Sequence, residues 1–325
     1  MSTLAMAIRD GDRRALARAI TLIESSRTDH RRQAEDLLAE VLPDASYSLR
    51  IGVSGAPGVG KSTFIEAFGL YLIEAGHRVA VLAVDPSSRR TGGSILGDKT
   101  RMEDLSRSPG AYIRPSPSSG TLGGVARRTR EVIALVESTG FDIILVETVG
   151  GGQSETAVAD LVDMFLLLLA PGAGNDLQGI KKGIVELADL IVVNKADGDL
   201  APAAERAYRD YAAALHLMRP SVGGWTPRVG KCSAFEAKGI AEVWQSTVAF
   251  RQFAEQSGAF ANRRAEQAMA AMWGEVTETL LADLTCDPEV KRAIDALKTD
   301  VRDGRVIPAI AARQILSTRI IREKM

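Results

Sequence analysis

A glycine-rich segment carries the most specific chemistry in this sequence. Residues 55–62 read Gly-Ala-Pro-Gly-Val-Gly-Lys-Ser, the full Gly-x-x-x-x-Gly-Lys-Ser pattern of a phosphate-binding loop, or P-loop. In that pattern backbone N–H groups surround the phosphates, the lysine reaches the β- and γ-phosphates, and the serine hydroxyl binds Mg²⁺. We therefore expect Lys61 and Ser62 to bind a nucleoside triphosphate with magnesium. The loop backbone comes from Gly55, Ala56, Pro57, Gly58, Val59 and Gly60.

A second motif, Asn194-Lys195-Ala196-Asp197, follows an apolar run and predicts which base is bound. The Asp197 carboxylate can accept hydrogen bonds from both N1–H and the N2 amino group of guanine. Adenine has no N2 amino group and its N1 carries no proton, so it would leave the carboxylate unpaired. Lys195 can lie along the base, and Asn194 can tie this segment to the P-loop. The motif predicts GTP and GDP as ligands.

A third segment, residues 232–235, reads Cys-Ser-Ala-Phe and follows the last predicted strand. Ser233 and Ala234 resemble a second loop on the base side, with the Ala234 N–H pointing at guanine O6. Phe235 follows this Ser-Ala pair. We expect Ser233, Ala234 and Phe235 to complete the base site.

Acidic residues follow two further predicted strands and suit a magnesium site. Asp85 ends one strand, where a carboxylate can hold a magnesium-bound or attacking water. Glu147 begins a Glu-x-x-Gly segment, in which the acid faces magnesium and the Gly150 N–H reaches the γ-phosphate. Asp98 is another magnesium-side candidate, although a solvated loop acid is an equally good interpretation. We expect Lys61, Glu147 and Gly150 to carry the phosphate chemistry.

Two polar residues after this segment are candidates for the group that activates water, and the sequence does not decide between them and other roles. Gln153 and Glu155 could orient water, but either could equally be a polar residue at the start of a helix. Phosphoryl transfer depends on positioning and charge neutralisation more than on covalent chemistry. The sequence therefore assigns no catalytic base.

The elements that must position these motifs alternate between short apolar runs and longer amphipathic stretches. This alternation predicts an α/β fold of the P-loop NTPase type, with a mostly parallel sheet covered by helices on both faces. Each motif follows a predicted strand, where ligands bind in such sheets. The predicted strands are residues 49–53, 79–84, 111–114, 143–146, 164–169, 190–193 and 228–231, and helices are expected at 62–75, 123–138 and 180–187.

Helical segments flank this domain. We expect an N-terminal helical extension at 1–45, the nucleotide-binding domain at 46–256 and a helical C-terminal segment at 257–325. In the last segment, apolar residues on one side of a helix can pack on the chain's own core or on a second chain. These residues are Met269, Met272, Trp273, Val276 and Leu280.

Composition limits the possible partners. The 325 residues carry a formal net charge of -1, which gives no support for nucleic-acid binding. The strongest apolar run, 164–170, is far shorter than the ~20 residues of a membrane-spanning helix. Charge appears too early at the N-terminus for a signal peptide, and Cys232 and Cys286 lack paired spacing. We expect a cytoplasmic protein that binds neither nucleic acid nor membrane.

These motifs together resemble the MeaB/ArgK family of GTPases, the chaperones of methylmalonyl-CoA mutase. The resemblance runs from about residue 46 to beyond residue 250 and is closest to MeaB. The flanking helices resemble the family only in type. The segments that carry it are residues 84–88, 91–102, 113–117, 120–124, 147–150 and 153–155.

The resemblance implies a GTPase that binds a coenzyme B12-dependent mutase, gates loading of adenosylcobalamin and protects the mutase from inactivation. It also implies a homodimer in which residues 257–325 form the dimerisation arm, and a segment at 171–181 that relays the nucleotide state. The site residues that it implies are Gly55 to Thr63 for the phosphates, Asp197 for guanine, Ser233 to Phe235 for the base loop, and Asp85, Asp98 and Glu147 on the magnesium side.

Two alternatives from other functional classes remain. One is a kinase of a transport protein, of the periplasmic arginine/ornithine-binding type, which would need a site for a phosphate acceptor. The other is a GTPase that inserts metal into another enzyme. The three histidines, His30, His77 and His216, have no second ligand nearby in the sequence and give that role no support. A partitioning ATPase is disfavoured by Asp197.

Overall fold

The computed structural model describes residues 2–25, 27–42, 48–84, 102–114, 122–148, 155–172, 182–215 and 222–323. The chain divides into two compact units, Met1–Gln267 and Ala268–Met325, which are taken separately below. Among the described helices, none is both long and apolar enough to cross a membrane.

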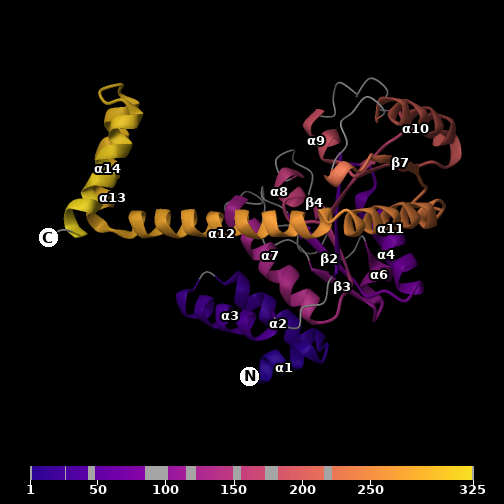
Figure 1. The fold of residues 1–325 in the computed structure, drawn as a ribbon, viewed down its shortest axis with the longest axis horizontal. Helices are drawn as coiled ribbons and strands as arrows, with labels where there is room; N and C mark the ends of the chain where they lie inside the picture. The colour runs from indigo at the N-terminus through magenta and orange to yellow at the C-terminus, as the bar shows by residue number, and fades with distance from the viewer. Residues whose placement is uncertain are drawn as a thin grey trace. The chain divides into compact units, whose positions relative to one another are not determined.

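A seven-stranded sheet forms the centre of the first unit, with every neighbouring pair of strands parallel (Figure 1). The strand order is β3-β2-β4-β1-β5-β6-β7, so the strand that precedes the P-loop lies in the middle. This confirms the predicted α/β fold. The strands are β1 (Leu49–Gly55), β2 (Val79–Val84), β3 (Ala111–Arg114), β4 (Ile143–Thr148), β5 (Met164–Leu169), β6 (Leu190–Val193) and β7 (Arg228–Lys231).

Helices cover both faces of this sheet. The helices are α1 (Thr3–Arg9), α2 (Arg13–Glu24), α3 (Thr28–Val41), α4 (Lys61–Glu74), α6 (Glu103–Arg107), α7 (Leu122–Ser138), α8 (Glu155–Ala159), α9 (Lys182–Leu187), α10 (Ala201–Leu215), α11 (Ile240–Gln256), α12 (Ala259–Cys286), α13 (Pro288–Arg302) and α14 (Pro308–Glu323). Figure 1 shows α4 and α6 together on one side of the sheet and α7 with α2 and α3 on the other.

Two apolar cores lie on opposite faces of the sheet, because side chains alternate along each strand. In β4, Ile143 and Leu145 belong to the core with α4, α6 and α11, whereas Ile144 and Val146 belong to the core with α1–α3, α7 and α10. Both faces being buried explains why the strands read as continuous apolar runs.

The N-terminal helices share the second of these cores. Their apolar face is buried, including Leu16 and Ile20 of α2, and packs on α7. Asp12 caps α2 by accepting hydrogen bonds from the N–H groups of Arg14 and Ala15. The segment therefore contributes to the core of the first unit.

The second unit is helical. Asp287 caps α13 by accepting a hydrogen bond from the Glu289 N–H, and Pro288 occupies the first turn, where its missing donor costs nothing. Val290 and Ala311 are buried inside this unit, and large apolar side chains are exposed on α12. Those exposed side chains are Met269, Met272, Trp273, Val276, Leu280 and Leu281.

Candidate nucleotide-binding site

The P-loop connects the middle strand β1 to helix α4 and needs glycine at specific points. Gly58 and Gly60 have φ angles of +79° and +93°, which other residues rarely adopt. A Cβ on Gly60 would also lie 2.8 Å from the Asn194 side-chain nitrogen. The Val59 side chain is buried in the core below the loop. The loop is therefore held in one conformation by backbone geometry and by packing.

Lys61, the first residue of α4, folds back onto this loop. Its Nζ donates a hydrogen bond to Gly55 O at 2.7 Å and lies 3.3 Å from Ala56 O, a second acceptor. Burial lowers the pKa of Lys61, and the charges of Glu147 and Glu155 oppose that effect. The ammonium group thus lies inside the phosphate loop, where backbone carbonyl oxygens accept its hydrogen bonds.

Ser62 and Glu147 meet at the mouth of the loop. The Ser62 hydroxyl donates to Glu147 Oε1 at 3.3 Å, and the Glu147 side chain is buried at the end of β4. Hydroxyl and carboxylate oxygens are the ligands that Mg²⁺ prefers. The neighbouring Thr148 hydroxyl donates to Ser54 Oγ at 3.0 Å, which fixes the end of β4 to β1.

The remaining candidates for the phosphate and magnesium site lie outside the described residues. Asp85, Asp98 and Gly150 fall in the ranges that the structure leaves undescribed, so their roles stay predictions. The pairing of Val84 with Thr148 brings the residue before Asp85 beside the end of β4.

Asn194 joins the phosphate side of the site to the base side. Its side-chain nitrogen donates to Val59 O at 3.0 Å, and its Oδ1 accepts the Ala234 N–H at 3.0 Å. Asn194 is itself buried at the end of β6. A single amide therefore holds the P-loop and the base loop in a fixed arrangement, as a buried, hydrogen-bonded polar group can.

Lys195 and Asp197 follow Asn194 after the end of β6, on the side of the site assigned to the base. Lys195 adopts a φ of +59° and donates from Nζ to Gly58 O at 2.7 Å. Asp197 accepts a hydrogen bond from the Ser233 hydroxyl, and the Glu236 N–H donates to the same hydroxyl at 3.0 Å. Ser233 thus orients the carboxylate that the sequence assigns to guanine.

The base loop is a tight turn after β7. A Cβ on Gly239 would lie 2.5 Å from Lys231 O, so the turn can close only with glycine there. Burial, together with the charge of Asp197, raises the pKa of the Cys232 thiol to about 12. Phe235 projects into solvent with 87% of its surface exposed. Its side chain is not needed to fold the turn.

Glu155 is the residue at this site whose position sequence reasoning left undecided. It is the first residue of α8, and its side chain is buried, while its charge acts on Lys61. A signal was available, because Glu155 stands three residues before Val158 and a helix places both on one face. Thr63 follows Ser62 in the first turn of α4 and is exposed.

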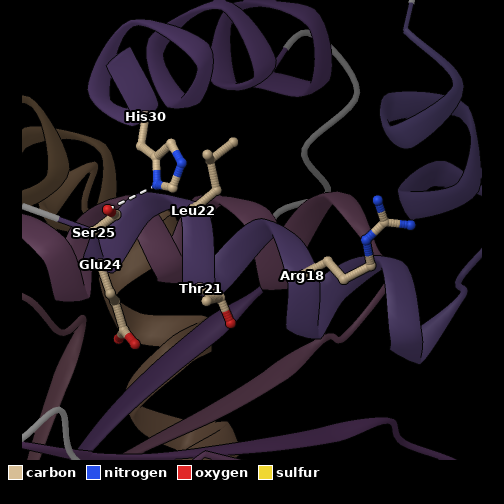
Figure 2. Close-up of a pocket in the computed structure, with 6 residues that line it drawn as sticks. All are labelled: Arg18, Thr21, Leu22, Glu24, Ser25 and His30. Carbon is tan, nitrogen blue, oxygen red and sulfur yellow. Dashed lines mark hydrogen bonds between the residues drawn. The ribbon is translucent and has the colours of Figure 1, made fainter. Parts of the chain in front are cut away.

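A separate surface pocket lies between α2 and α3, away from the residues named above. It has a volume of about 550 Å³, and Figure 2 shows the hydrogen bond of 2.8 Å between His30 Nδ1 and Ser25 Oγ at its edge. Glu24 at its base forms an ion pair with Arg114, whose pKa burial lowers to about 10. The pocket is lined by Arg18, Thr21, Leu22, Glu24, Ser25 and His30.

Comparison with known proteins agrees with this geometry. A family model described as methylmalonyl Co-A mutase-associated GTPase MeaB matches residues 16–289. A probable GTPase of Mycobacterium tuberculosis is 55% identical over 313 residues, which cover 96% of this chain and 93% of that protein. The mouse mitochondrial methylmalonic aciduria type A homolog is 49% identical and is matched over 94% of this chain and 76% of its own length.

A solved structure supports the same assignment. The crystal structure of a protein described as LAO/AO transport system kinase superimposes with a TM-score of 0.78 at 39% identity. The superposition covers 97% of this chain and 96% of that one. Because the family model spans most of this chain, including both nucleotide loops, this chain belongs to the MeaB family of P-loop GTPases.

Proposed function

We propose that this GTPase is a chaperone of methylmalonyl-CoA mutase, which uses GTP to gate loading of adenosylcobalamin and to protect the mutase from inactivation. The observation that carries the proposal is the match of the mutase-associated family model to residues 16–289. The name of the mouse relative, a methylmalonic aciduria protein, points to the same client. The nucleotide site described above supplies the switch that such a role needs.

The residues at the phosphate side of the site have separate roles in hydrolysis. Lys61 neutralises charge on the β- and γ-phosphates, and backbone N–H groups of residues 55–63 surround them. Ser62 and Glu147, with Asp85 and Asp98, would hold Mg²⁺, which neutralises phosphate charge when bound. The Gly150 N–H would bind the γ-phosphate. Water then attacks the γ-phosphorus, the bond to the β-phosphate oxygen breaks, and GDP and inorganic phosphate result.

The base side gives the site its preference for guanine. Asp197, oriented by the Ser233 hydroxyl, accepts the N1–H and N2 amino hydrogens of the base. The Lys195 stem covers one face of the ring. The Ala234 N–H donates to Asn194 Oδ1, and a contact with guanine O6 would share this donor between the two oxygens. A base without an N2 amino group leaves the Asp197 carboxylate partly unpaired and binds more weakly.

We further propose a homodimer that works in the cytoplasm. The exposed apolar side chains of α12, among them Met272 and Trp273, form the type of surface that associates with a second copy. The free, exposed Cys286 suits a reducing compartment, in which surface thiols persist.

A kinase acting on a transport protein is the second candidate, because the matched crystal structure carries that description. The two functions differ in where the γ-phosphate goes. With GTP labelled in the γ-phosphate, the GTPase role predicts that label appears as inorganic phosphate. Transfer of the label to an added periplasmic binding protein would favour the kinase.

Nucleotide-dependent capture of the mutase tests the proposal. The tagged protein, loaded with a non-hydrolysable GTP analogue, should retain methylmalonyl-CoA mutase on a column. The Asp197→Asn variant is the matched control, because it should retain the mutase only with the corresponding xanthosine analogue. Association in no nucleotide state would rule out the chaperone role, whereas it would leave GTP binding itself intact.

A further inference from the structure

The side-chain amide of Asn194 makes three hydrogen bonds that join separate segments of the site. Its Nδ2 donates to Val59 O at 3.0 Å. Its Oδ1 accepts two hydrogen bonds, from the Ala234 N–H at 3.0 Å and from the Cys232 thiol at 3.5 Å. Asn194, Cys232 and Ala234 are all buried. Water is therefore a poor substitute for a donor that leaves this oxygen, and the two protein donors must satisfy it.

The two donors to this oxygen differ in what else claims them. The Ala234 N–H is the group that the sequence assigns to guanine O6, so the base and Asn194 compete for it. The Cys232 thiol stays beside the amide, because its backbone is held on both sides. The Cys232 N–H donates to Val193 O at 2.9 Å, and the Cys232 carbonyl accepts the Ala196 N–H at 3.0 Å. The thiol is thus the fixed donor and the N–H is the contested one.

The thiol keeps its proton under ordinary conditions. Burial, together with the charge of Asp197, raises the pKa of Cys232 to about 12, so the proton stays on sulfur at neutral pH. A thiol is a weaker hydrogen-bond donor than a backbone N–H. While the Ala234 N–H is present, the thiol is the minor partner of the amide oxygen. Its contribution becomes important when the base draws that N–H away.

We propose that Cys232 is a positioning residue for guanine recognition, whose thiol keeps the Asn194 amide oxygen hydrogen-bonded while the Ala234 N–H turns to guanine O6. The proposal rests on the proposed guanine site. It places the effect of the thiol in the bound state, because without nucleotide the Ala234 N–H satisfies Oδ1 whether or not a thiol is present. Without the thiol, guanine binding leaves two oxygens to share one N–H, and a buried acceptor short of a donor is unfavourable.

Calorimetric titration of the full-length protein with GDP and magnesium measures the effect. Cys232→Ala and Cys232→Val both remove the donor, one with a smaller and one with a larger side chain, and Cys232→Ser keeps a donor. We expect the Ala and Val variants to bind GDP about fivefold to tenfold more weakly, which corresponds to a buried acceptor short of a donor. The Ser variant should bind GDP like the unmodified protein. Thr247→Ala is the control, because it removes a fully buried hydroxyl that bonds within α11.

Analogues of the base separate this exchange of donors from damage to the loop. Inosine diphosphate keeps O6 and lacks the N2 amino group, whereas 6-thioguanosine diphosphate keeps the N1–H and the N2 amino group and carries sulfur, a weaker acceptor, in place of O6. The loss in the Cys232→Ala variant should persist with inosine diphosphate. It should shrink with the thio analogue, because sulfur draws the Ala234 N–H less strongly from Asn194. Equal losses for all three diphosphates would indicate a general loosening of the loop and would overturn the proposal.

Failure of this proposal and failure of the guanine site give different results. Unchanged GDP affinity in both the Ala and Val variants, or an equal loss in the Ser variant, overturns the role of the Cys232 thiol and leaves the guanine site in place. Equal affinity of the unmodified protein for GDP and ADP removes the guanine site, and the role of the thiol with it. The mutase is absent from these titrations, so the chaperone role is tested separately.

Discussion

Arg264 binds Asp163 through two parallel hydrogen bonds, from Nε to Oδ1 and from Nη2 to Oδ2, both 2.7 Å long. The same Nη2 donates to Ser48 O at 2.6 Å, and the backbone N–H of Arg50 donates to Asp163 Oδ2 at 2.9 Å. Asp163 is almost fully buried. The first turns of α12 are therefore fixed to the starts of β1 and β5, at the edge of the sheet opposite the nucleotide.

Loss of this pair should strongly destabilise the first unit. Arg264→Ala leaves the Asp163 carboxylate buried with only backbone donors, and removing one partner of a buried pair costs about 3–5 kcal/mol. The free energy of unfolding, measured with urea, should fall by an amount in this range. Arg251→Ala is the control, because the Arg251–Glu255 pair is on the surface and should contribute no more than about 1 kcal/mol. Equal losses in both variants would contradict a special role for Asp163.

The assignment of Asp197 to guanine predicts a change of base preference. Asp197→Asn replaces an acceptor with a side chain that can donate to the O2 oxygen of xanthine. Affinity for GDP should fall by about 10²-fold or more, and xanthosine diphosphate should become the preferred ligand. Competitive titration of the two nucleotides measures the ratio. An unchanged ratio would mean that Asp197 does not contact the base.

The two cysteines should differ sharply in reactivity. Cys232 is buried with its pKa raised to about 12, so almost no thiolate exists at pH 8, whereas Cys286 is exposed. A thiol reagent should modify one cysteine per chain in the native protein and two in denaturant. The Cys286→Ser variant should show no rapid reaction. Rapid modification of Cys232 in that variant would contradict its burial.

The same thiol makes stability depend on pH in alkaline solution. Because the folded pKa of Cys232, about 12, lies above its ordinary value of 9.0, the unfolded chain loses this proton first. The contribution of the protonated thiol to stability is therefore complete below pH 9 and is lost as the pH rises toward 12. In urea titrations, Cys232→Ala should show a smaller loss of stability over this window than the unmodified protein. Parallel curves would contradict the raised pKa.

The order of strands and helices could be predicted because a parallel strand buried on both faces appears in the sequence as a continuous apolar run. The continuous apolar run 164–169 is one example, and β5 occupies that range. The end residues of the strands were harder to predict from the sequence. β1 continues to Gly55 because Gly55 pairs with Leu168, and β4 continues to Thr148 because it pairs with Val84. Such limits depend on partners distant in the chain.

For the site, local motifs identified the loops but not the contacts between them. The P-loop and the Asn194 segment are each visible as short patterns, because the chemistry of phosphates and guanine requires fixed spacings. By contrast, the Arg264–Asp163 pair joins residues 101 positions apart and has no local pattern. The burial of Glu155 likewise depends on Gly52, a residue on another element.

Gly52 offers a final test of how the fold positions the site. A Cβ at this position would lie 3.0 Å from Val158 Cγ1 and Val162 Cγ2 and 3.2 Å from the Phe165 ring. Gly52→Ala should therefore push α8 away from β1 and cost about 1–3 kcal/mol in the free energy of unfolding. Because Glu155 is the first residue of α8, the same substitution should also raise the exposure of this buried side chain.

The matched control is Gly274→Ala in α12, where an added Cβ would meet nothing within 4 Å. That substitution should raise the free energy of unfolding by up to about 1 kcal/mol, since alanine favours a helix over glycine. If Gly52→Ala were as stable as the unmodified protein, then the close packing of α8 on β1 would not depend on the absence of a side chain at position 52.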